Sequence, residues 1–271
     1  MMTELFASWH DLPGLSVYAL SEFPLFLLFV IFVFGTCFGS FANAAAMRIV
    51  RDEDPALQAS RCRHCDTDLK WHHNIPLFGW LLLRGKSACC DRPIGSRYIL
   101  VEVSFGIIMT ALFALLPLAH AGILSLASFI MMTALLTDSE AMVLHPPSLL
   151  AGMILGWLAP LIIADWPHSA SEALIGSLIC AGLIFIINKS YYLLRGHNGF
   201  GAGDIWLMGM IGAIYGSIAG ITIFFAATFV GALTGISLIL VKKADSGSKL
   251  PFGLFLSVVF LLYPALNMLL K

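Results

Sequence analysis

Residues 23–47 read FPLFLLFVIFVFGTCFGSFANAAAM, a run without a charged side chain. An α-helix needs about 17–25 apolar residues to cross the hydrocarbon core of a bilayer, so this run predicts a membrane-spanning helix. The acidic residues Glu4, Asp11 and Glu22 precede it, and no Lys or Arg does. Because a secretory signal peptide carries basic residues before its apolar stretch, we expect a retained helix whose N-terminus faces outside.

The remainder of the chain has the same character. Of the 271 residues, 59% are hydrophobic and 11% are charged, whereas soluble domains average about 25% charged residues. We therefore predict an all-α polytopic membrane protein with about eight transmembrane helices. The apolar runs that predict them are 23–47, 98–119, 121–137, 147–164, 171–188, 204–218, 219–241 and 250–270.

The basic residues divide this chain into three parts. Nine of the fifteen Lys and Arg lie between Arg48 and Arg97, and such residues mark the cytoplasmic side of short loops. We therefore expect an N-terminal segment with the first helix (1–47), a cysteine-containing cytoplasmic domain (48–97), and a transmembrane domain of about seven helices (98–271).

Two carboxylates stand out at the predicted cytoplasmic ends of the helices. Asp138 ends the third apolar run and Asp204 begins the sixth. Acids near the membrane interior are costly and mark functional sites, and two carboxylates in one pocket cannot both ionise easily. This predicts an aspartic-protease dyad, although Asp204 also occupies the position of an ordinary helix N-cap. The partial charges at helix ends favour a charged Asp204, as the base, and a protonated Asp138.

Glycines surround the second of these acids in the stretch GFGAGD (199–204). A dinucleotide-binding fingerprint needs another glycine spacing and a preceding strand, so the phosphate-loop interpretation is weak. Glycine lets a ligand come close to the backbone. We therefore expect Gly201 and Gly203 to bring an extended peptide close to Asp204.

Together, Asp138 and Gly201–Asp204 resemble the G-x-G-D intramembrane aspartyl proteases, and the wider chain resembles the bacterial prepilin peptidases, or type IV leader peptidases. Further motifs of that family follow in the right order. They are GTCFGSFANAAAMRI (35–49), CRHCDTDLKWHHNIPLFGWLLLRGK (62–86), RPIGSRYILVE (92–102) and LPFGLFLS (250–257), the last with Leu254 in place of a proline.

The resemblance implies that Asp138 and Asp204 are the catalytic pair. It further implies cleavage of basic leaders from type IV prepilins or type II secretion pseudopilins, at the cytoplasmic face of the bacterial inner membrane. Many members then methylate the new N-terminus with S-adenosylmethionine. We expect the partners to be these substrates and the lipid bilayer, with no nucleic acid. By position, Glu102 and Glu140 are candidates for contact with a basic leader.

Four cysteines in the cytoplasmic domain predict a structural zinc site. Cys62 and Cys65 form a C-x-x-C pair, and Cys89 and Cys90 follow. Two such pairs are a typical zinc signature, but the second pair is adjacent, whereas the family pattern has cysteines at 87 and 90. The fourth ligand is therefore open between Cys89 and a histidine, the candidates being His64, His72 and His73.

A second class of function is a transporter or channel in which Asp138 and Asp204 bind ions or protons. Such proteins place their polar groups near the middle of the membrane. The two acids here lie at predicted helix ends, which favours the peptidase.

Overall fold

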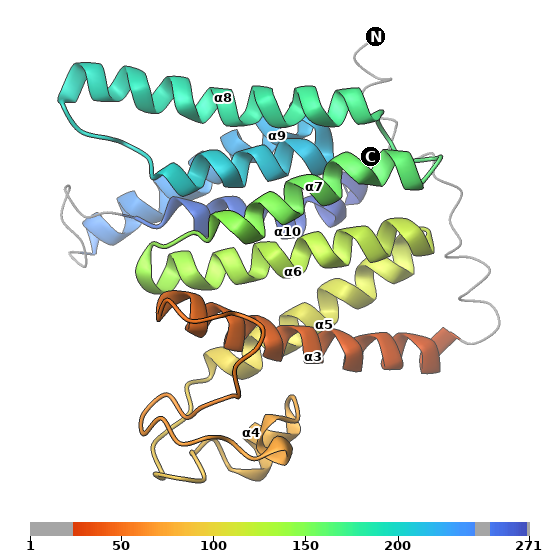
Figure 1. The fold of residues 1–271 in the computed structure, drawn as a ribbon, viewed down its shortest axis with the longest axis vertical. Helices are drawn as coiled ribbons and strands as arrows, with labels where there is room; N and C mark the ends of the chain where they lie inside the picture. Colours follow the sequence, from red (N-terminus) through yellow and green to blue (C-terminus); the bar gives the residue numbers. More distant parts are fainter. Residues whose placement is uncertain (1–23, 242–249, 270–271) are drawn as a thin grey trace. The chain divides into compact units, whose positions relative to one another are not determined.

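The structure, a computed structural model, describes residues 24–241 and 250–269. The predicted location of the N-terminus therefore lies outside the described residues. Within them the chain is helical and contains isolated β-bridges but no strand, which confirms the all-α prediction. The helices are α3 (Pro24–Val50), η1 (Trp71–Asn74), α4 (Phe78–Leu82), α5 (Arg97–Leu115), α6 (Leu118–Ala141), α7 (Pro146–Ile162), α8 (Ala170–Arg195), α9 (Ala202–Leu240) and α10 (Phe252–Leu269) (Figure 1).

Five of the described helices, α3, α5, α6, α8 and α9, are long and apolar enough to cross a membrane. The helices α7 and α10 are apolar but shorter. The α9 helix combines two predicted spans, and its backbone leaves the helical conformation at Gly216, with φ 81° and ψ 175°. Because glycine adopts positive φ at little cost, the expected division near residues 215–220 occurs at this residue.

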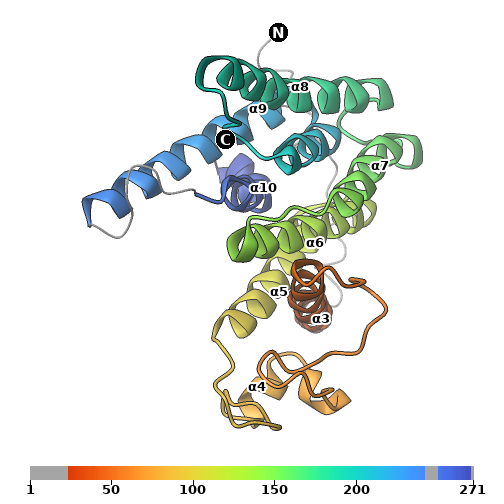
Figure 2. The same ribbon diagram turned by 60° about the vertical axis from the view of Figure 1, so that its left-hand side comes forward.

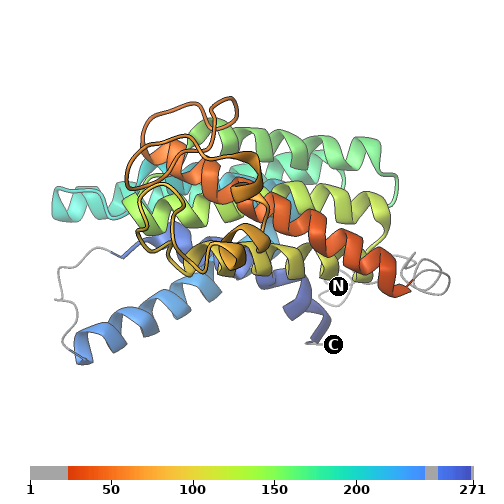
Figure 3. The ribbon, with the colours of Figure 1, turned by 90° about the horizontal axis from the view of Figure 1, so that it is seen from below.

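Two compact units make up the chain, the first ending at Ser125 and the second beginning at Leu126. In the first unit α3 packs along α5. The polar segment between these two helices gathers where α3 ends and α5 begins, as Figure 3 shows from below. It contains η1, α4 and two turns closed by the bridges Arg61–Asp68 and Lys86–Pro93.

In the second unit α9 is the central helix, since α7, α8 and α10 all pack against it (Figure 2). Its first segment is buried almost without interruption from Leu207 to Tyr215. The last turn of α6 and the first turns of α9 and α10 carry the residues of the candidate active site.

Candidate active site

Asp138 lies in the last turn of α6 and is 5% exposed. Its Oδ2 accepts a hydrogen bond of 2.8 Å from the amide of Leu254, and the amide of Gly253 also donates to this carboxylate. Both amides belong to the first turn of α10, where backbone N–H groups have no partner within the helix. The start of α10 therefore binds and orients Asp138.

Asp204 lies in the first turn of α9 and is 7% exposed. Its Oδ2 accepts a hydrogen bond of 2.9 Å from the amide of Gly201, the residue that precedes the helix. This contact spans three residues, so the G-x-G-D stretch itself folds back on the carboxylate. The N-cap residue of α9 is Gly201, so the sequence interpretation that placed Asp204 at that position is wrong. Asp204 is the third residue of the helix, and its side chain reaches back to the amide of the N-cap.

The two carboxylates belong to the same compact unit. The segments that hold them also touch, because the rings of Phe200 and Phe252 pack edge to face with 5.0 Å between centroids. Phe200 precedes Gly201, and Phe252 precedes Gly253. The structure thus brings Asp138 and Asp204 together in the second unit.

The proton assignment predicted from helix ends does not follow from this geometry. It treated Asp138 as a group at a helix C-terminus, but the N-terminus of α10 donates to that carboxylate. The partial positive charge of a helix N-terminus therefore acts on both acids, and helix ends do not decide which carboxylate carries the proton.

Gly203 is required for close packing. A Cβ atom at this position would lie 2.5 Å from Cβ of Leu144, in the connection between α6 and α7. Leu144 also packs at Gly253, where an added Cβ would lie 3.2 Å from its Cδ1 and 3.0 Å from Oδ2 of Asp138. One leucine thus contacts the segments that support both carboxylates.

Asn188 in α8 is a positioning residue that the sequence analysis missed. Its Oδ1 accepts hydrogen bonds from the amides of Gly199 at 2.9 Å and Phe200 at 3.0 Å. It therefore holds the loop that leads into Gly201 and Asp204. The signal in the sequence was an amide side chain near the end of an otherwise apolar run.

His145 has a local role at the start of α7. Its Nδ1 accepts a hydrogen bond of 3.4 Å from the amide of Ser148 and so caps α7. Pro146 follows at the first position of the helix, where proline is well tolerated. His145 and Pro146 therefore define the start of α7.

The four cysteines of the first unit form one cluster. Their sulfur atoms all lie within 4.8 Å of one another, with Cys62 and Cys90 3.8 Å apart and Cys65 and Cys89 3.0 Å apart. Four thiolates at about 2.3 Å from a tetrahedral zinc ion lie about 3.8 Å apart. The cluster fits zinc after a small outward movement of one pair, and among the described residues no histidine belongs to it.

Two similar turns build this cluster. The amide of Asp66 donates to the carbonyl of Cys62 at 3.0 Å, and the amide of Asp91 donates to the carbonyl of Ser87 at 2.9 Å. Ser87 therefore occupies the place in the second turn that Cys62 occupies in the first. Cys89, two residues later, supplies the sulfur that Ser87 lacks, which is how adjacent cysteines reach one site.

Hydrogen bonds prepare one of these sulfurs for a metal. Burial raises the pKa of the Cys62 thiol, but hydrogen bonds from the Ser87 hydroxyl and the backbone of His64 and Cys65 outweigh it and lower the pKa to about 5. The Ser87 hydroxyl lowers the pKa of Cys89, but the sulfurs of Cys65 and Cys62 raise it to about 12. These hydrogen bonds favour the thiolate form of Cys62, and a bound cation would displace the remaining protons.

The two glutamates predicted to contact a leader lie in different units. Glu140 is exposed, two residues beyond Asp138 in the last turn of α6. Glu102 belongs to α5 in the first unit, is 6% exposed, and accepts a hydrogen bond of 2.8 Å from the amide of Leu77.

Comparison with known proteins agrees with this geometry. Residues 33–116 match the bacterial peptidase A24 N-terminal domain, and residues 123–236 match the type IV leader peptidase family. A protein of Stutzerimonas stutzeri named prepilin leader peptidase/N-methyltransferase is 31% identical over 266 residues, which cover 88% of this chain and 90% of that protein. The chain belongs to the type IV leader peptidase family.

Two further relatives carry the same name. The Klebsiella pneumoniae protein is 31% identical, with 72% of this chain and 88% of the relative covered. The Pseudomonas aeruginosa protein is 28% identical, with 88% and 90% covered. No solved structure matches the chain.

The family matches divide the chain as the structure does. The leader peptidase region includes both aspartates, and the N-terminal domain includes the cysteine cluster. The gap between the two matches, residues 117–122, lies close to the boundary of the units at Ser125. Family membership and the five long apolar helices together indicate a multi-pass inner-membrane protein.

Proposed function

We propose that this chain is a prepilin leader peptidase and N-methyltransferase. Its substrates are type IV prepilins or type II secretion pseudopilins, which it cleaves at the cytoplasmic face of the membrane. One observation carries the peptidase assignment. Asp138 and Asp204 come from helices far apart in the sequence, yet both are buried, each accepts hydrogen bonding from backbone amides, and the segments that hold them are in contact.

The chemistry is that of an aspartic dyad. One carboxylate takes a proton from a water molecule, whose oxygen attacks the carbonyl carbon of the scissile peptide bond. The other carboxyl group donates a hydrogen bond to the carbonyl oxygen. The C–N bond then breaks as the leaving nitrogen gains a proton, and the mature protein keeps a free N-terminal amine. The amides of Gly201 and Leu254 hold the carboxylates in place.

The relatives are also named N-methyltransferases, and the group methylated would be that amine. S-adenosylmethionine would supply the methyl group. The first unit, which contains the cytoplasmic domain (48–97), is its natural host because this cofactor is water-soluble. Zinc at Cys62, Cys65, Cys89 and Cys90 would stabilise the same domain, whose short turns provide little core of their own.

A transporter or channel is not supported. The chain belongs to a peptidase family, and both carboxylates lie in the terminal turns of their helices.

The test of this function is cleavage of a prepilin in detergent by the wild type, Asp138→Asn and Asp204→Asn. The exchange keeps the size of each side chain but removes the acid, so each variant should lose about 10³-fold or more in cleavage rate, towards the upper end of general acid–base effects. Mass spectrometry of the product, with S-adenosylmethionine present, should show one added methyl group in the wild type. Cleavage that survives either exchange would remove the dyad.

The zinc proposal is tested by the metal content of the purified protein. Wild type should contain one zinc per chain, and Cys62→Ala should contain almost none. Cys37→Ala is the matched control because Cys37 is a free cysteine of α3 outside the cluster. Equal metal content in all three proteins would refute the cluster as the site.

A further inference from the structure

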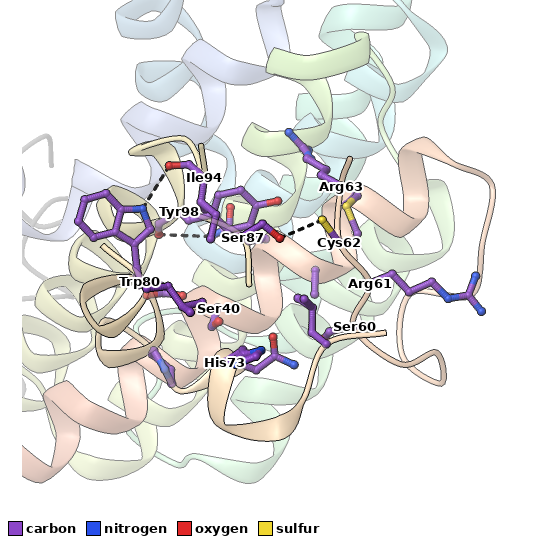
Figure 4. A pocket seen from close by; sticks show the side chains of 18 of the residues that line it. Ser40, Ser60, Arg61, Cys62, Arg63, His73, Trp80, Ser87, Ile94 and Tyr98 are labelled. Carbon is purple, nitrogen blue, oxygen red and sulfur yellow. Dashed lines mark hydrogen bonds between the residues drawn. The ribbon is translucent and has the colours of Figure 1, made fainter. Parts of the chain in front are cut away.

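The first unit contains a cavity of about 570 Å³. The end of α3, the start of α5 and the turns of the polar segment line it (Figure 4). Small-molecule sites in proteins have volumes of about 300–1,000 Å³. This cavity lies beside the cysteine cluster, because Cys62 and Ser87 belong to its wall.

The charges of the cavity wall suit a ligand that carries both signs. Glu102 is the one carboxylate among the lining residues. It is buried, and Ser40 and the amide of Leu77 hold it by hydrogen bonds. Arginines line other parts of the wall, and Arg61 is the exposed one among them, while its Nε also donates a hydrogen bond of 3.3 Å to Asp68. A ligand with a cationic group and a carboxylate would find a partner for each.

Asn43 adds a polar group to the same wall. Its Nδ2 donates to the carbonyls of Gly39 and Tyr98, each at 3.4 Å, so its Oδ1 is the remaining acceptor. This oxygen is buried and has no hydrogen-bond partner within residues 24–241 and 250–269. A buried acceptor without a donor costs roughly 1–3 kcal/mol, so a ligand or water that donates to it would be favoured.

Aromatic side chains complete the wall. Trp80 is fixed by a hydrogen bond of 3.2 Å from its Nε1 to the carbonyl of Ile94, and the guanidinium of Arg63 lies 5.8 Å from the ring centroid of Tyr98. Figure 4 shows Trp80, Tyr98 and Ile94 at this cavity. Flat rings of this kind can pack against the base of a nucleoside.

We propose that this cavity is the S-adenosylmethionine site, with Glu102 facing the cationic part of the cofactor and the arginines facing its carboxylate. This proposal rests on the methyltransferase half of the proposed function. The cofactor is a zwitterion that joins an amino acid, a sulfonium and a purine, which matches one buried acid, several arginines and two aromatic rings in a single cavity.

When bound, S-adenosylmethionine provides a methyl group for the substrate amine, which releases a proton to solvent as the sulfonium becomes a thioether. The role of the chain is to bind and orient the cofactor. Glu102 supplies a fixed negative charge next to α3, and the walls of the cavity exclude water from the sulfonium.

The first test fills the cavity. Ser60 lines it, whereas the neighbouring Ala59 is exposed and lies outside it, so Ser60→Phe and Ala59→Phe form a matched pair. Binding of S-adenosylmethionine to the full-length protein in detergent is measured by isothermal titration calorimetry. We expect Ser60→Phe to raise Kd at least tenfold relative to Ala59→Phe, and the ratio of methylated to cleaved product to fall in parallel.

The second test removes the charge and decides the matter if Ser60→Phe does not fold. Glu102→Gln should raise Kd for S-adenosylmethionine about tenfold. It should raise Kd for S-adenosylhomocysteine less, because that thioether lacks the sulfonium charge. Glu53→Gln, a carboxylate outside the cavity wall, is the control and should leave both values unchanged.

The outcomes separate this proposal from the proposed function. If the wild type methylates its product but Ser60→Phe and Glu102→Gln bind the cofactor as tightly as it does, the cavity is not the site and the function stands. If the wild type cleaves prepilin but neither binds the cofactor nor methylates, the methyltransferase assignment fails, and this proposal fails with it.

Discussion

The two carboxylates of the candidate active site are held in different ways. Asp204 accepts a hydrogen bond from Gly201, three residues before it, whereas Asp138 accepts one from Leu254, 116 residues after it. One half of the site is therefore built by a local turn, and the other half exists only when α10 reaches α6. Any change that loosens α10 should affect Asp138 first.

Among substitutions around the two aspartates, the largest effect on cleavage is expected from Gly203→Ala, which disturbs the contact between the two halves of the site. The added methyl group would lie 2.5 Å from Cβ of Leu144, in the segment that follows Asp138. Overpacking of this kind costs typically 1–3 kcal/mol, and displacement of the carboxylates should lower prepilin cleavage roughly 100-fold. The measurement is kcat/KM together with Tm.

Gly201→Ala is the control for this prediction. A Cβ atom there would lie at an ordinary contact distance of 3.4 Å from Oδ2 of Asp204. It should change cleavage only a few-fold, and an equal loss in both variants would show that the contact with Leu144 is not what requires glycine.

Gly253→Ala should disturb the distant half alone. Its methyl group would lie 3.0 Å from Oδ2 of Asp138 in a first turn that otherwise tolerates alanine. We expect about a tenfold loss of kcat with KM nearly unchanged, because the orientation of Asp138 changes and the binding surface does not. A rise in KM without a change in kcat would contradict this assignment.

Asn188→Leu should weaken the local half by freeing its loop. It removes the acceptor of two backbone amides, and each such hydrogen bond contributes about 0.5–1.5 kcal/mol. Cleavage should fall about fivefold and recover in Asn188→Asp, which restores the acceptor. The exposed Asn198 provides the control variant Asn198→Leu. A loss that Asn188→Asp does not rescue would exclude the hydrogen bonds as the cause.

The smallest effect is expected from Leu254→Pro. Proline fits the first turn of a helix but has no N–H group, so this exchange removes the 2.8 Å hydrogen bond to Asp138 and leaves that from Gly253. We expect a two- to fivefold loss of kcat, whereas Leu254→Ala, which keeps the amide, should retain wild-type activity. Equal rates for both variants would show that the Gly253 amide alone suffices.

The same comparison explains what the sequence could and could not predict. Apolar length and the positions of basic residues predicted the helices and a division near residues 215–220, which the structure places at Gly216, because these depend on local properties. The sequence also placed Asp204 at the start of a helix, although its position is the third residue of α9 and not the N-cap. The support of Asp138 by α10 is a tertiary contact that no sequence spacing reveals. For this reason the partial charges at helix ends do not decide whether Asp138 or Asp204 carries the proton.

The cysteine cluster lies between these cases. The C-x-x-C pair indicated two of the four sulfurs. The displaced second pair left Cys89 and three histidines as alternatives for the fourth metal ligand. Only the position of Ser87, which takes the place of Cys62 in the second turn, shows why the sulfur of Cys89 belongs to the cluster. The side chain of Asn188 was missed because nothing in its local sequence marks the loop that it binds.

Both acids lie in terminal turns of their helices, Asp138 in the last turn of α6 and Asp204 in the first turn of α9. A substrate bond at this level lies where an apolar helix of the substrate itself ends and its backbone groups lack helical partners. Under the proposed function, the attacking water molecule would therefore not have to cross the hydrocarbon layer to reach the two acids. Cleavage there would also cost no free energy for unwinding the middle of a substrate helix.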